Sequence, residues 1–141
     1  DATVLRIAAD KAAKAGVAVE WKQGFAHDAP RIARQVDKAV SSLVFHQVPM
    51  QGKRAGVAAI WDSLSLGGAA FIADYAKQSR ALDRLLFRAT VQLLDGVTDT
   101  QPNADGALEQ IIKDITGTRP ALVDQVATAT GRISTFKFQK F

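Results

Sequence analysis

The residues best suited to chemistry in this 141-residue chain are polar side chains that follow short apolar runs. His46 and Gln47 come directly after Leu43–Phe45, and Asp62 comes directly after Val57–Trp61. A histidine changes charge near neutral pH and can transfer protons, and a glutamine side chain both donates and accepts hydrogen bonds. In an open α/β sheet, ligands bind just beyond the carboxyl ends of the strands. We therefore expect a small-molecule site at His46 and Gln47.

Each candidate also has a purely structural interpretation. His46 could be a hydrogen-bonded histidine at a strand end, and Asp62 could cap the loop in which it lies. Trp61 stands where an aromatic pocket wall would lie, and core packing is the alternative. Thr3, at the head of an alanine-rich helix, could combine its hydroxyl with exposed backbone N–H groups to hold a carboxylate, sulfonate or phosphate. The sequence leaves these alternatives open.

The composition excludes several kinds of protein. The chain has no cysteine and two histidines, which excludes disulfides and argues against a histidine-rich metal site. Its net charge of +4 is dispersed. No apolar run approaches the roughly 20 residues of a membrane span, and the G-x-G-x-x-G and G-x-S-x-G motifs are missing. We expect a single domain over residues 1–141 with no nucleic-acid partner, no membrane insertion, no metal and no cofactor.

The first half of the chain is predicted to alternate between strands and helices. Its apolar residues switch between the two-residue period of a strand and the 3.6-residue period of a helix. The predicted elements are a helix over 3–15 closed by Gly16, a strand over 17–23, a helix over 30–40 capped by Asp28, and strands over 43–50 and 57–61. Residues 69–73 fit either a strand or the start of a helix.

The second half is predicted to be mainly helical, with apolar residues at helical spacing. The predicted elements are a helix from Ser79 to Leu93 with Leu82, Leu85 and Leu86 inward, a helix from Asn103 to Gly117, a helix from Thr118 to Gly131, and an amphipathic strand over 133–141. Strands that alternate with helices favour the α/β class. We predict a single three-layer domain with helices packed on a small, mostly parallel sheet.

Two segments carry a family pattern. The first includes V-E-W at 19–21 and Q-V-D-K-A-V-S-S-L-V-F-H-Q-V-P-M at 35–50, and the second includes Q-P-N-A-D-G-A-L at 101–108 and T-G at 116–117. Together they resemble the second lobe of periplasmic solute-binding proteins of ABC transporters, of the nitrate, sulfonate, taurine and thiamine-precursor type. Arg34 and Lys38 depart from the Gly and Ala usual in that family, and the family's first lobe has no counterpart here.

The resemblance implies a non-catalytic domain that binds a small polar or anionic organic solute. In the family pattern Thr3 offers helix N-terminal donors, His46 and Gln47 hydrogen-bond the ligand, and Trp61 and Asp62 lie on the neighbouring loop. A second lobe or a second copy of the chain would complete the cleft, and an ABC permease would be the transport partner. The resemblance also implies a periplasmic or extracellular location, although the chain opens without a signal peptide.

Two other functions stay open. The same fold could serve as an effector-sensing or protein-interaction module, which a fused DNA-binding helix-turn-helix would reveal. Alternatively, a small α/β enzyme could use His46 and Asp62 as acid and base. Replacing His46 would lower the turnover of an enzyme by orders of magnitude, whereas a binding protein would lose affinity modestly.

Overall fold

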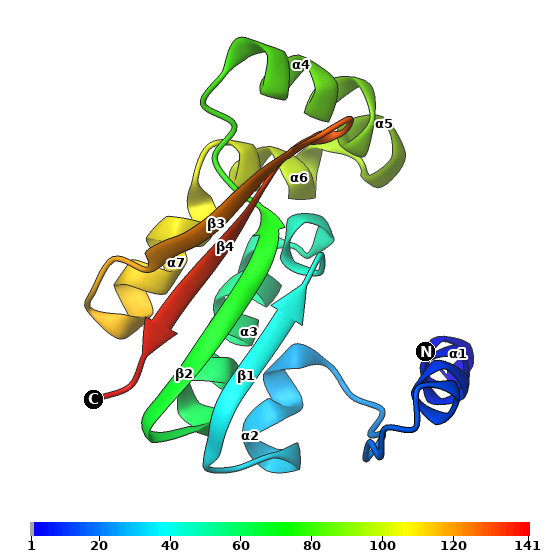
Figure 1. Ribbon diagram of the computed structural model, residues 1–141. Helices are drawn as coiled ribbons and strands as arrows, with labels where there is room; N and C mark the ends of the chain where they lie inside the picture. Colours follow the sequence, from blue (N-terminus) through cyan, green and yellow to red (C-terminus); the bar gives the residue numbers. More distant parts are fainter. Residues whose placement is uncertain (1) are drawn as a thin grey trace.

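A mixed four-stranded sheet is the centre of the fold (Figure 1). The computed structural model describes residues 2–141. The strands lie in the order β1 (Val36–Ser42), β2 (Leu64–Tyr75), β4 (Gly131–Gln139) and β3 (Ala121–Thr128). β1 and β2 are parallel, whereas β4 is antiparallel to both β2 and β3. The predicted α/β class is confirmed, and the sheet is mixed where mostly parallel strands were predicted, because the C-terminal hairpin adds two antiparallel pairs.

Two helices, α3 (Met50–Ser63) and α7 (Ala107–Thr116), pack on one face of this sheet and enclose the main core. The core is built by Val57, Ile60, Ile72, Leu108, Ile111, Ile112, Phe136 and Phe138. On the other face, Val40 of β1 is 78% exposed. The sequence predicted helices on both faces of the sheet. Among the described residues, the two helices that enclose the main core, α3 and α7, lie on the same face.

Three short helices gather at the end of the sheet where β1 ends: α4 (Ala81–Ala89), α5 (Val91–Asp95) and α6 (Val97–Ala104) (Figure 1). The predicted single helix from Ser79 to Leu93 is wrong, because the non-helical backbone of Thr90 divides it into α4 and α5. Its predicted inward face is also wrong, since Leu82 and Leu85 are each 63% exposed. Phe87 and Val91 are buried instead, in a second small core with Tyr75 and Ala104.

Several strands predicted in the first half are misplaced. Residues 17–23 are exposed and form no strand. The helix predicted over 30–40 is reduced to α2 (Ala29–Ile32), which follows the 3-10 turn η1 (Ala26–Asp28), and β1 occupies its second half. The strand predicted over 43–50 is therefore too late, because β1 is an edge strand whose charged residues hide its pattern. Residues 57–61 lie inside α3, since five apolar residues fit a buried helix face equally well.

The predictions for the second half divide in the same way. α7 ends at Thr116 and is followed by Gly117, whose φ is 75°, and β4 matches the predicted C-terminal strand. The helix predicted from Thr118 to Gly131 is wrong, because these residues form β3 and the turn into β4. Asn103 does not cap α7 but lies buried in α6, where its Nδ2 donates to the carbonyl of Tyr75 at 2.7 Å.

The N-terminal segment, residues 2–24, contains the predicted helix, but this helix does not contribute to the core of the domain. α1 (Ala2–Lys14) is followed by Gly16 with a φ of 66°, as the sequence indicates. No residue of the described α1 is buried, and Figure 1 shows the helix apart from the sheet. None of the described helices has the length and apolar character needed to cross a membrane.

Candidate functional site

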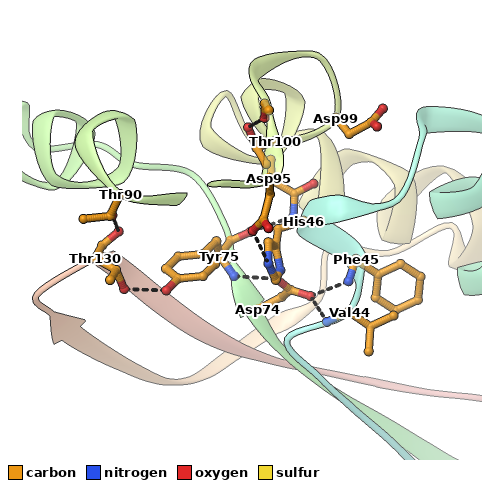
Figure 2. Close-up of polar contacts among 12 residues, drawn as sticks. Val44, Phe45, His46, Asp74, Tyr75, Thr90, Asp95, Asp99, Thr100 and Thr130 are labelled. Carbon is orange, nitrogen blue, oxygen red and sulfur yellow. Dashed lines mark hydrogen bonds and ion pairs between the residues drawn. The ribbon is translucent and has the colours of Figure 1, made fainter. Parts of the chain in front are cut away.

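The parallel strands β1 and β2 bring two chain segments together at one end of the sheet. β1 ends at Ser42, and the 3-10 turn η2 (Phe45–Gln47) follows. Asp74, near the end of β2, is fully buried beside this turn. Its Oδ2 accepts hydrogen bonds from the backbone N–H groups of Val44 at 3.0 Å and Phe45 at 2.6 Å (Figure 2). One carboxylate therefore fixes the backbone of the turn that carries His46.

The same carboxylate orients the His46 ring. His46 Nδ1 lies 2.8 Å from Asp74 Oδ1, and His46 is only 6% exposed. The ring also meets the edge of Tyr75, with centroids 5.1 Å apart and planes at 80°. Because an ionised carboxylate only accepts, a hydrogen bond to Asp74 requires the proton on Nδ1, and a neutral ring then has its lone pair on Nε2. A buried aspartate orients the histidine base of serine proteases in this way.

A second carboxylate lies at the other ring nitrogen. Asp95 Oδ2, at the end of α5, is 3.5 Å from His46 Nε2 (Figure 2). The Asp95 side chain is 33% exposed, so the Nε2 side of the His46 ring contacts a partly exposed carboxylate. When His46 takes up a proton, the resulting cation has a carboxylate on each side.

A buried lysine binds the backbone carbonyls of the same turn. Lys53 of α3 is fully buried, and its Nζ donates to the carbonyls of Phe45, His46 (3.1 Å) and Asp99 (2.8 Å). Burial lowers the pKa of Lys53 to about 8, although the charges of Asp74 and Asp99 act to raise it. Lys53 thus binds the carbonyls of η2 while Asp74 binds its N–H groups. We call His46, Lys53, Asp74 and Asp95 the His46 cluster.

The structure separates the five residues that the sequence proposed as a binding site. His46 lies in the cluster, and Gln47 is exposed beside it. Trp61 and Asp62 lie at the far end of α3, about 20 Å along the helix from η2. Trp61 packs against Phe138, with ring centroids 6.3 Å apart. Thr3 lies in α1. The structure does not bring Thr3, Trp61 or Asp62 to His46, and their ligand roles stay predictions.

Sequence reasoning missed three members of the cluster. Asp74 follows the apolar run at 69–73, so the rule that selected His46 would also have selected Asp74 had that run been assigned to a strand. Asp95 carries no comparable signal, because α5 is only five residues long. Lys53 could not be found from sequence, since its partners are backbone carbonyls.

No family model matches the chain, and no curated protein matches it. Solved structures do. The chain superimposes on an O-methyltransferase family protein from Burkholderia thailandensis with a TM-score of 0.66 and 16% identity, over 96% of this chain and 41% of that one. A protein assigned as an O-methyltransferase from Nostoc punctiforme gives 0.70 and 18%, over the same shares. The magnesium protoporphyrin IX methyltransferase of Synechocystis, solved with bound SAH, gives 0.56 and 14%, over 81% of this chain and 49% of that one.

These neighbours correct the functional predictions. The resemblance to periplasmic solute-binding proteins is wrong, because the fold is shared with methyltransferases. The expectations of a non-catalytic protein, a transported solute and a permease partner are contradicted with it. The small-enzyme alternative agrees better with the neighbours, although its Asp62 lies far from His46. The chain spans about two fifths of the length of the first two neighbours named.

Proposed function

We propose that this chain forms the acceptor-activating part of a methyltransferase, with His46 as the general base. Two observations support the proposal. The chain shares its fold with O-methyltransferases, and the buried Asp74 holds His46 Nδ1 while Nε2 faces the partly exposed Asp95. The His46–Asp74 pair carries the argument, because a histidine held in one tautomer is suited to take a proton from a hydroxyl.

The described residues do not form a complete binding site for a nucleoside methyl donor such as S-adenosylmethionine. Such a site needs glycines that leave room for a ligand near a strand end. Beside η2, a Cβ at Gly56 would meet Phe45 Cε1 at 2.8 Å, and one at Gly52 would meet Val48 Cγ1 at 2.5 Å. Side chains of the protein already fill both spaces. No step through the donor is therefore assigned to these residues.

The chemistry assigned to this chain is the movement of one proton. His46 Nε2 accepts the proton of an acceptor hydroxyl, and the O–H electron pair stays on the oxygen, which becomes the nucleophile. Asp74 keeps the imidazolium in place through Nδ1, and Asp95 faces the proton on Nε2. The proton leaves to solvent past the partly exposed Asp95.

The test compares methyl transfer to phenolic acceptors in the protein that carries this chain, using S-adenosylmethionine with a labelled methyl group. His46→Gln should lower kcat by about 100-fold or more, because general base catalysis contributes that much. His27→Gln is the control, since His27 is the other histidine and is exposed. It should retain the wild-type rate.

A second acceptor sharpens this test. 4-Nitrophenol loses its proton more readily than phenol, so it should depend much less on His46 for activation. The penalty of His46→Gln should therefore shrink with 4-nitrophenol. An equal penalty for both phenols, or no methyl transfer by the unmodified protein, would show that His46 is not the base of a methyltransferase.

A further inference from the structure

A cavity of about 400 Å³ lies among α4, α5 and α6. Its volume falls in the range of small-molecule sites, which begins at roughly 300 Å³. The lining combines apolar and polar residues, among them Arg84, Phe87, Arg88, Gln92, Gln101 and Ala104. Phe87 and Ala104 are buried and form the apolar floor.

The polar wall of the cavity is held in place by its own hydrogen bonds. Gln92 is only 6% exposed, and its Nε2 donates to Gln101 Oε1 at 2.9 Å. Gln101 Nε2 in turn donates to Asp105 Oδ2 at 2.9 Å. Asp105 also lies 3.7 Å from Arg84, whose Nε donates to the carbonyl of Gln78. The acidic group near the cavity and Arg84 are therefore both engaged.

Arg88 differs from Arg84. It lines the same cavity and is exposed, and no hydrogen bond or ion pair joins it to any other described residue. An arginine presents a planar fork of donors that matches a carboxylate with two parallel hydrogen bonds. The cavity thus has an apolar floor, a fixed amide wall and, in Arg88, one cation that has no partner among residues 2–141.

The cavity adjoins the His46 cluster by two routes. Gln92 and Asp95 are three residues apart on α5, so they lie on neighbouring positions of one helix face, and Asp95 contacts His46. From the floor, the ring centroid of Phe87 lies 5.2 Å from that of Tyr75, which in turn lies 5.1 Å from that of His46. A ligand in the cavity would therefore lie one side chain away from the proposed base, with Tyr75 or Asp95 between them.

We propose that this cavity binds a small organic acid with an apolar, ring-sized body, its carboxylate on Arg88 and its body over Phe87. The identification of this acid as the methyl acceptor rests on the proposed function. The binding itself does not, because it depends only on the cavity.

The experiment measures binding of 4-hydroxybenzoate without any methyl donor, by calorimetry and by NMR shifts of the Gln92 and Gln101 side-chain amides. Its neutral analogue, 4-hydroxybenzamide, has nearly the same shape. Arg88→Gln should raise the Kd for the acid about tenfold or more, since a charge-assisted pair is lost. The amide should bind the unmodified protein correspondingly more weakly than the acid.

Arg6→Gln is the matched control, because Arg6 is an exposed arginine on α1. It should leave the Kd unchanged. The proposal is overturned by equal affinity for acid and amide, by equal effects of the two arginine variants, or by no saturable binding of the acid. Binding without methyl transfer would remove the proposed function and keep the cavity assignment. Methyl transfer that depends on His46, without binding of the acid, would keep the proposed function and remove the cavity assignment.

Discussion

The N-terminal segment and the His46 cluster show two opposite ways in which a sequence pattern becomes structure. The helix α1 forms where its periodicity predicts, yet Val4 and Ile7 on it are 61% and 46% exposed. The turn at His46 follows no regular pattern, yet two of its N–H groups, two of its carbonyls and His46 Nδ1 bind the buried side chains of Asp74 and Lys53. Periodicity therefore predicts that an element exists, whereas the density of buried polar contacts marks where the chain has one fixed arrangement.

The largest expected effect comes from the shared carboxylate. The two carboxylate oxygens of Asp74 bind four N–H groups, those of Val44, Phe45 and Tyr75 and His46 Nδ1. Asp74→Asn keeps only one acceptor oxygen, so at least two of these groups lose their partner. We expect the free energy of unfolding to fall by about 3–5 kcal/mol. Urea denaturation followed by circular dichroism measures it. Asp10→Asn, on the exposed face of α1, should change it by less than about 0.5 kcal/mol.

The next effect is that of the buried lysine. Lys53→Met leaves three carbonyls without their donor and should lower the free energy of unfolding by about 2–3 kcal/mol at neutral pH. Lys14→Met on α1 is the matched control and should be nearly neutral.

The same variant has a defined pH dependence. The pKa of Lys53 is about 8 in the folded chain, below the ordinary 10.5, so between these values the unfolded chain binds more protons. The stability of the unmodified protein should therefore rise relative to Lys53→Met as the pH increases from about 8 to 10.5. A difference that stays constant over this range would show that Lys53 is not desolvated.

The smallest effect is expected in the N-terminal segment. Ile7→Ala should change the free energy of unfolding by no more than about 0.5 kcal/mol, because Ile7 is 46% exposed. Ile112→Val, a smaller deletion in the core, should cost about 1 kcal/mol. If Ile7→Ala proved the costlier of the two, α1 would be packed on the domain in solution, and the contrast between the two regions would disappear.

Those parts of the fold that bury one face could be predicted from sequence. In α7, Leu108, Ile111 and Ile112 share one helix face, and in β4 Phe136 and Phe138 alternate with polar residues. Both patterns follow directly from one-sided burial. β3 could not be predicted, because seven of its eight residues are exposed and its side chains carry no burial pattern.

The site was predictable only in part. His46 was found because a polar residue after an apolar run marks a strand end, even though the strand lies earlier than predicted. Its partners come from residues 53, 74 and 95, and only the pairing of β1 with β2 and the packing of α5 bring them together. Distances between segments that are remote in sequence depend on strand order, which a single sequence does not specify.

The place of β1 at the edge of the sheet has a consequence for coupling. Beyond β2, the described residues offer β1 no other neighbour, so its outer backbone groups form a template onto which a further strand could add. β1 runs directly into η2, and Asp74 ties that turn to the second strand. A strand docked on this edge would extend the sheet and contact the strand that leads into the His46 turn. Binding of a partner strand and the proposed proton transfer would then depend on the same element, β1.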